Sequence, residues 1–163
     1  MKHFNRRLFI LVPFASFINF ILKPQRVYAA SKDPQENWSL SKTEWKEKLS
    51  PEVFNILREE GTERPFTSPL NNEKRNGVFH CAGCNQPLFL SEYKYDSGTG
   101  WPSFWQSITS AIETKIDFKL IVPRTEYHCS RCGGHQGHVF NDGPQPTGKR
   151  YCNNGLALTF KPE

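Results

Sequence analysis

The chain changes its pattern of apolar and polar residues three times. Residues 8–22 form a mostly apolar run behind a basic head, and residues 30–40 are polar and predict a flexible, extended tail. From residue 41 apolar residues recur at helical spacing, and from residue 77 they occur in short runs separated by turn residues. This order predicts a leader, a pair of helices and then a domain of short strands.

Two short helices are expected at the start of the domain. Ser41 and Glu44 form a capping box, in which each side chain satisfies a free N–H group at the start of the first helix. Ser50 caps the second helix, with Pro51 at its first position, and Gly61 is its natural end. The residues that follow, 62–76, predict a wrapping loop.

The remaining chain predicts antiparallel sheet. The strand candidates are residues 78–80, 87–90, 111–114, 118–122, 125–128, 138–140 and 155–160. We therefore expect one domain over residues 41–163, mainly β within the α+β class, with two or three short N-terminal helices packed on antiparallel sheets.

The first 29 residues have the features of a cleaved signal peptide. The apolar run is short for a membrane span, which needs about 20 residues, and Val27-Tyr28-Ala29 offers small residues where a signal peptidase cuts. A membrane anchor is the alternative. The paired arginines of Asn5–Ile10 resemble a twin-arginine export signal. We expect export to a periplasm or thylakoid lumen, with membrane contact only during export.

The charge balance changes once this leader is removed. The chain has 21 basic and 16 acidic residues, and five of the basic residues but no acidic ones lie in residues 1–29. The rest of the chain is therefore neutral, at 16 of each. The basic character is no sign of a nucleic-acid partner, and none is expected.

Four of the five cysteines form two C-x-x-C pairs, Cys81 with Cys84 and Cys129 with Cys132. Two tight turns of this kind can surround one tetrahedral zinc ion with four thiolates, and such a closed site is structural. The alternatives are a redox dithiol in each pair or two disulfides. Because 44 residues separate the pairs, we expect a sheet between them whose ends the metal ties together.

The fifth cysteine, Cys152, is the candidate nucleophile. In a strand Arg150, Cys152 and Asn154 share one face, so that Arg150 favours the thiolate and Asn154 offers a hydrogen bond. Leu156, Leu158 and Phe160 would continue this face into the core. An inert, buried cysteine is the alternative, although such a cysteine prefers apolar neighbours.

Two histidines and a tryptophan are further candidates. His135 and His138 can hold an oxygen atom and pass it a proton, since imidazole titrates near neutral pH. A plain structural role for either one is the alternative. Trp101 follows a glycine-rich loop, and its flat apolar ring suits a methyl-sulfur substrate.

These motifs together resemble the B-type peptide methionine sulfoxide reductases, over about residues 40–160. Besides the two cysteine pairs, the resemblance is carried by Gly61–Phe66, Tyr95–Phe104, Gly137–Phe140, Asp142–Pro144, Pro146–Gly148 and Arg150–Cys152 with Asn154.

The resemblance implies reduction of methionine-R-sulfoxide in oxidised proteins. Cys152 would attack the sulfoxide sulfur and become a sulfenic acid, while His135 and His138 hold the oxygen, directly or through water. The other residues implied are Arg150, Asp142 and Asn154 around the sulfur, Trp101 and Phe140 at the substrate, and the zinc ligands Cys81, Cys84, Cys129 and Cys132.

The chain departs from the family at three positions. Thr99 stands where many members have a resolving cysteine, which implies that an external thiol, thioredoxin-like or small, reduces the sulfenic acid. Asn153 and Gly155 replace an apolar residue and a serine. Two other hypotheses stay open: a non-enzymatic zinc-binding interaction module, and a thiol–disulfide oxidoreductase that uses the C-x-x-C pairs.

Overall fold

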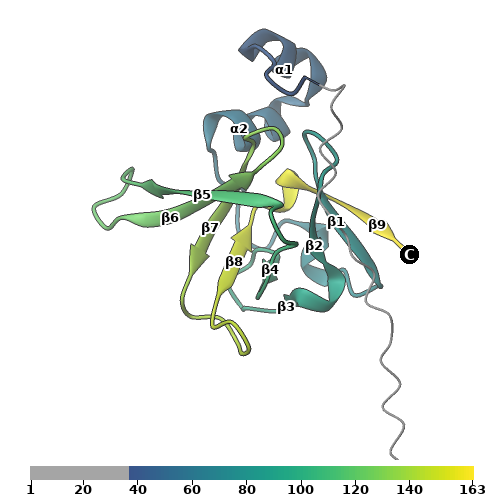
Figure 1. Ribbon diagram of the computed structural model, residues 1–163, viewed down its shortest axis with the longest axis vertical. Coiled ribbons are helices and arrows are strands. Elements are labelled where there is room, and N and C mark those ends of the chain that lie inside the picture. Colours follow the sequence, from purple (N-terminus) through teal and green to yellow (C-terminus); the bar gives the residue numbers. More distant parts are fainter. Residues whose placement is uncertain (1–36) are drawn as a thin grey trace, which may run out of the picture.

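The computed structural model describes residues 37–163, so the predicted leader and residues 30–36 of the predicted tail lie outside the described part (Figure 1). At the start of that part, Trp38 stacks on Trp45 with ring centroids 6.2 Å apart. Trp38 and Leu40 both pack against the core. Within residues 37–163 the helices are all too short or too polar to cross a bilayer.

The chain forms two helices, then strands joined by turns. The helices are α1 (Lys42–Lys48) and α2 (Pro51–Glu59). The strands are β1 (Gly77–Cys81), β2 (Pro87–Leu90), β3 (Lys94–Tyr95), β4 (Ser103–Phe104), β5 (Ile112–Asp117), β6 (Arg124–Cys129), β7 (His135–Phe140), β8 (Arg150–Asn153) and β9 (Leu158–Pro162). Short 3-10 helices are η1 (Pro69–Asn72), η2 (Ser91–Tyr93) and η3 (Gly155–Ala157).

The helix ends follow the capping rules. The Ser41 hydroxyl accepts the Glu44 N–H at 3.3 Å, and the Glu44 carboxylate accepts the Ser41 N–H at 2.7 Å, so the predicted capping box is present. Ser50 caps α2 as expected. The left-handed residue that ends α2 is Glu60, with φ of 55°, and Gly61 follows it.

The strands form two antiparallel sheets, which confirms the predicted fold class. One sheet has the order β2-β1-β9, and the other has the order β3-β4-β8-β7-β6-β5. Figure 1 shows the two helices at the end of the molecule where β1 and β6 finish. The long β5–β6 hairpin projects from the larger sheet.

Aromatic side chains from both sheets form the core. Phe79 of β1 and Phe89 of β2 contact Phe104 of β4, with ring centroids 5.0 and 4.2 Å apart. Tyr127 of β6 meets the edge of Phe89. These four side chains are fully buried, and burying an aromatic side chain stabilises a fold by roughly 1.5–3 kcal/mol. The packing of the sheets fixes β4, which in turn pairs with β8.

Two predicted strands are wrong. Residues 118–122 are the exposed end of the β5–β6 hairpin, because pairing of Asp117 with Arg124 leaves the residues between them to reverse the chain. Residues 155–160 divide into η3 and the start of β9. The turn at η3 carries the chain from the larger sheet to the smaller one, where β9 pairs with β1. The face of Cys152 therefore does not continue through Leu156.

Candidate active site and metal centre

The four paired cysteines converge on one point between the sheets. Their sulfur atoms all lie within 4.8 Å of one another, and all four residues are buried. The Sγ atoms of Cys81 and Cys132 are 3.7 Å apart, and those of Cys84 and Cys129 are 3.5 Å apart. These distances exceed an S–S bond of about 2.05 Å and are close to the edge of about 3.8 Å of a tetrahedron with Zn–S bonds of about 2.3 Å. The cluster can hold a metal ion.

Each cysteine pair follows the end of a strand and turns in the same way. Cys81 ends β1 and Cys129 ends β6. The Cys81 carbonyl accepts the Asn85 N–H, and the Cys129 carbonyl accepts the Gly133 N–H, both at 2.8 Å. Asn85 and Gly133 have φ of 59° and 68°. Since β1 and β6 belong to different sheets, the cluster joins the two sheets rather than the ends of one.

Cys152 lies in the middle of the larger sheet, on β8. Its Cα partners are Ser103 on β4 and His138 on β7. Directly opposed residues of antiparallel strands point to the same face, so the register sets His138 beside Cys152. Thr99 approaches from the preceding loop, with its hydroxyl oxygen 3.9 Å from the sulfur.

A shallow pocket of about 110 Å³ opens onto Cys152. Among the predicted site residues, Trp101, His138, Phe140 and Asn154 line it together with Cys152. The Trp101 indole is fixed by donating its N–H to the carbonyl of Glu63 at 3.0 Å. Two aromatic rings, an imidazole and an amide thus surround a half-buried thiol.

Arg150 favours the Cys152 thiolate as predicted, but burial outweighs its effect. Burial raises the pKa of this thiol above its ordinary value of 9.0, and the nearby carboxylate of Asp142 adds to the rise. Thr99 and Arg150 act in the opposite direction but do not outweigh the burial. The thiol, rather than the thiolate, is the resting form at neutral pH.

The raised pKa predicts how Cys152 reacts with an alkylating reagent. We expect the rate of its alkylation by iodoacetamide, followed by mass spectrometry, to keep rising beyond pH 9, because only the thiolate is nucleophilic. Replacing Arg150 by methionine removes an interaction that lowers the pKa, so the rate at pH 8 should fall. A plateau in the rate below pH 8 would contradict this assignment.

His138 is held by a carboxylate behind it. Its Nε2 lies 2.8 Å from the Asp117 carboxylate, whose pKa is well below its usual range because it accepts the Lys119 N–H and the His138 hydrogen bond and pairs with Arg124. Burial lowers the pKa of His138. A neutral imidazole that donates from Nε2 keeps Nδ1 as a free acceptor.

His135 is held in the same way but lies deeper. It is 3% exposed, and its Nδ1 lies 2.7 Å from the Glu126 carboxylate. Glu126 also accepts a hydrogen bond from His128 at 3.1 Å. Burial alone would raise the pKa of Glu126, but the two histidine hydrogen bonds leave it below the ordinary value. The His135 and His138 rings lie 5.5 Å apart, so His135 stands behind the pocket wall.

Arg150 and Asp142 form a pair at the edge of the site. The guanidinium binds the carboxylate through two hydrogen bonds of 2.8 Å, and the Asp142 side chain is 61% exposed. Arg150 also covers the ring of Phe140 at 4.3 Å. Neither residue of the pair lines the pocket, but Arg150 lowers the pKa of Cys152 through its charge and through a hydrogen bond.

Asn154 lies at the pocket but its amide is already engaged. Its oxygen accepts the Glu63 N–H at 2.9 Å, and its nitrogen donates to the Gln136 carbonyl at 3.0 Å. The argument from alternate strand positions expected Asn154 near Cys152, and both residues line the pocket. It missed that β8 ends at Asn153 and that the amide connects three segments of the chain.

Sequence reasoning missed the carboxylates that orient the histidines, Asp117 and Glu126. Glu126 is 2% exposed and is the Cα partner of His138. A charged residue is almost never fully buried without a partner, but the sequence shows no apolar context that would mark this position as buried. The pairing of β6 with β7 was needed to find it.

Known proteins match the chain over most of this fold. Residues 49–162 match the SelR domain family. The chain is 52% identical over 137 residues to peptide methionine sulfoxide reductase B1, chloroplastic, of Arabidopsis thaliana, covering 83% of this chain and 67% of the relative. Peptide methionine sulfoxide reductase MsrB of Methanosarcina barkeri is 53% identical over 124 residues, 76% of this chain and 87% of the relative. Methionine-R-sulfoxide reductase B2, mitochondrial, of Rattus norvegicus is 48% identical over 132 residues, 76% of each chain.

These relatives and the site define the class of protein as an oxidoreductase. Within that class, the chain belongs to the SelR family, that of the MsrB methionine sulfoxide reductases. The hypothesis of a non-enzymatic module is therefore not supported. A dithiol function for the C-x-x-C pairs is not supported either, because all four sulfur atoms converge on one point.

Proposed function

We propose that the protein reduces the R epimer of methionine sulfoxide in polypeptides to methionine, with Cys152 as nucleophile. The observation that carries the proposal is the pocket, where a thiol outside the cysteine cluster lies among Trp101, Phe140 and His138. The names of the relatives support methionine sulfoxide as substrate, and the name of the rat protein supports the R epimer.

The chemistry balances with the resting thiol. The Cys152 sulfur loses its proton to the sulfoxide oxygen and bonds to the sulfoxide sulfur. The hydroxyl then moves to Cys152 as a sulfenic acid, while the S–S bond and the S–O bond of the substrate sulfur break and methionine is released. Two electrons pass from the cysteine sulfur to the substrate sulfur. Because only the thiolate is nucleophilic, Cys152 gives up its proton as it attacks, and that proton is the one that the sulfenic hydroxyl requires.

The pocket residues have separate roles in substrate binding and in proton transfer. Trp101 and Phe140 contact the methyl and methylene groups of the substrate, because both rings line the pocket. The free Nδ1 of His138 orients the sulfoxide oxygen through a water molecule, and His135 supports it from behind. Arg150, held by Asp142, supplies positive charge near the developing oxyanion, and Asn154 shapes the wall.

Turnover then requires an external reductant. All five cysteines lie in the described residues 37–163, and Cys152 is the one outside the cluster. Thr99, at the position where many family members have a resolving cysteine, has its hydroxyl oxygen 3.9 Å from the Cys152 sulfur. Two equivalents of an external thiol, thioredoxin-like or small, reduce the sulfenic acid to the thiol and release water and a disulfide.

We further propose that the cysteine cluster holds a structural zinc ion. Four thiolates are a donor set that zinc prefers, and they leave no open position for substrate. The Gln136 amide donates to Cys81 Sγ at 3.5 Å, and Arg58 donates to the Cys132 carbonyl at 2.9 Å. When bound, the metal stabilises the fold and takes no part in the redox step.

The place of action that we propose is outside the cytoplasm, in a periplasm or thylakoid lumen, where the enzyme repairs oxidised exported proteins. The support is the sequence of residues 1–29, with its basic head, short apolar run and Val27-Tyr28-Ala29.

One pair of measurements tests the proposed function. We expect the protein to turn over N-acetyl-methionine-R-sulfoxide with dithiothreitol as reductant, to leave the S epimer unchanged, and to contain one equivalent of zinc by atomic emission. Turnover of the S epimer alone, or a metal-free protein with a redox-active C-x-x-C pair, would contradict the proposal.

Glu126 provides a test of how His135 is positioned. The carboxylate accepts from both His135 and His128, whereas the amide of Glu126→Gln has one acceptor oxygen and cannot serve both. A hydrogen bond to a charged group contributes roughly 1.5–3 kcal/mol, so we expect kcat to fall about tenfold or more, with an altered pH profile and little change in KM. Glu113→Gln, an exposed carboxylate on β5 that also faces His128, is the matched control. Equal activity of both variants would remove Glu126 from the mechanism.

A further inference from the structure

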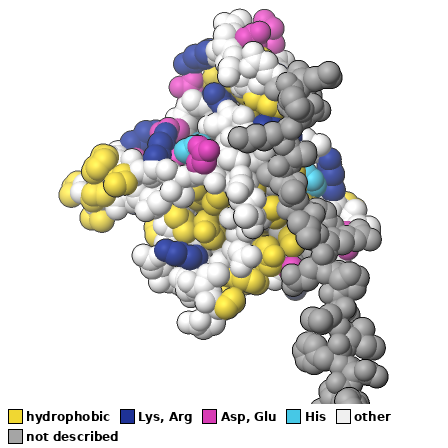
Figure 2. All heavy atoms as spheres, viewed as in Figure 1, with side chains coloured by type: hydrophobic (Ala, Val, Ile, Leu, Met, Phe, Trp, Pro, Cys, Tyr) yellow, Lys and Arg dark blue, Asp and Glu magenta, His cyan; other side chains and the backbone are white. Residues whose placement is uncertain are grey.

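The end of the β5–β6 hairpin is unusually apolar for a chain reversal. We call the residues Phe118, Leu120, Ile121 and Val122 the apolar tip; their exposed fractions are 72%, 57%, 103% and 71%. Figure 2 shows these hydrophobic side chains as a group that projects from the body of the molecule. Contiguous apolar surface of this kind marks an interaction site.

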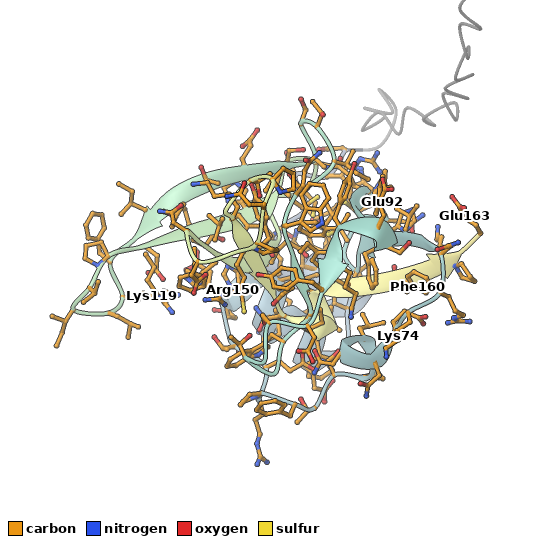
Figure 3. The ribbon with its side chains drawn as sticks, turned by 90° about the horizontal axis from the view of Figure 1, so that it is seen from below. Lys74, Glu92, Lys119, Arg150, Phe160 and Glu163 are labelled. Atoms are coloured by element: carbon orange, nitrogen blue, oxygen red, sulfur yellow. The ribbon has the colours of Figure 1, made fainter. Side chains whose placement is uncertain are left out.

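The apolar tip adjoins the pocket that contains Cys152. The residues at its two ends, Asp117 and Arg124, are paired at 2.6 Å. Arg124 lines the pocket, and Asp117 holds His138. In Figure 3, Lys119 of the hairpin and Arg150 of β8 lie in the same half of the molecule. A substrate polypeptide with one side chain in the pocket can therefore extend along the hairpin.

The cations of the hairpin are already paired with carboxylates. Lys115 and Lys119 both bind Glu60, at 2.5 and 2.6 Å, and their hydrogen bonds lower the pKa of Glu60 to about 2. Arg124 is paired with Asp117. Attraction of anionic lipid headgroups needs basic residues that are available to them. The charges thus favour an apolar polypeptide over a membrane surface, and Glu60 fixes the hairpin to the end of α2.

We propose that the apolar tip binds the apolar residues that flank an oxidised methionine in an unfolded or locally unfolded polypeptide. This inference rests on the proposed function. Methionine is usually buried among apolar residues, and its sulfoxide is polar and disrupts the core around it. The sulfoxide of a damaged protein is therefore exposed on a segment with apolar neighbours, which fits a pocket bordered by an apolar arm.

The test compares three R-sulfoxide substrates with the full-length chain and a double variant, Phe118→Ser with Ile121→Ser. The substrates are N-acetyl-methionine-R-sulfoxide, a peptide with leucine and valine beside the sulfoxide, and a peptide of equal length with serine and glycine there. We expect the variant to lose about tenfold in kcat/KM for the apolar peptide, mainly through KM, since the two serines remove apolar surface that the peptide would bury. Turnover of the other two substrates should stay unchanged.

The conservative double variant, Phe118→Leu with Ile121→Leu, keeps the apolar tip and should retain the preference for the apolar peptide. Equal losses on all three substrates, or no loss on any, would overturn the inference. So would binding of the chain to phosphatidylglycerol vesicles that depends on the tip, if peptide preference were unaffected. Failure of the proposed function has a different signature, because the unaltered chain would then not reduce N-acetyl-methionine-R-sulfoxide at all, and both proposals would fall.

Discussion

Replacing Cys152 by serine is expected to abolish sulfoxide reduction. In the proposed mechanism the thiol accepts the oxygen, and serine cannot form a sulfenic acid, so we expect turnover of N-acetyl-methionine-R-sulfoxide to fall by at least about a thousandfold. Cys152 lies outside the cysteine cluster, so zinc content should not change. Activity assays and atomic emission on the same preparation measure both quantities.

The neighbouring residue on β8 supplies a control for this variant. Tyr151→Phe removes a hydroxyl next to Cys152, from a side chain that packs against the core with Tyr127 and Phe89. It should retain turnover, because Tyr151 does not line the pocket. If Cys152→Ser keeps measurable activity against the R epimer, Cys152 is not the nucleophile.

Removal of one cluster cysteine should have the largest effect on stability. Cys84→Ser takes away one of four buried sulfur donors that lie within 4.8 Å of one another. Structural zinc contributes roughly 10–16 kcal/mol of binding free energy in small zinc peptides, of which a mutant site retains part. We expect the free energy of unfolding to fall by about 3 kcal/mol or more, measured by urea denaturation.

Cys152→Ser is the matched control for stability, since it also removes one thiol but leaves the cluster complete. Its free energy of unfolding should change by less than about 1 kcal/mol. A Cys84→Ser protein as stable as the unaltered chain, with the same zinc content, would show that the cluster is not a structural metal site.

The features that could be predicted from the sequence depend on residues that are close together in the chain. The capping box at Ser41 and Glu44, the cap at Ser50 and the two equivalent cysteine turns each depend on residues a few positions apart. The strand that sets Arg150 and Cys152 on one face is also a local feature. For such features the alternation of side chains or a hydrogen bond to the next turn is sufficient.

The features that could not be predicted from the sequence depend on how the strands pair in the folded protein. Phe118 to Val122 have the composition of a strand, but the pairing of β5 with β6 makes them a loop. Burial raises the pKa of Cys152 although Arg150 is near, and burial is a property of the assembled sheets. The carboxylates of Asp117 and Glu126 reach the histidines only because β5, β6 and β7 are neighbours.

The cysteine cluster has a further consequence for the unfolded chain, considered as a polymer. A metal ion held by both turns acts as a cross-link across the 44 residues between Cys84 and Cys129. By analogy with a disulfide, closing a loop of that size removes chain entropy equivalent to roughly 4 kcal/mol at room temperature. A chain that held the metal at both turns would therefore have less entropy to lose when the two sheets come together.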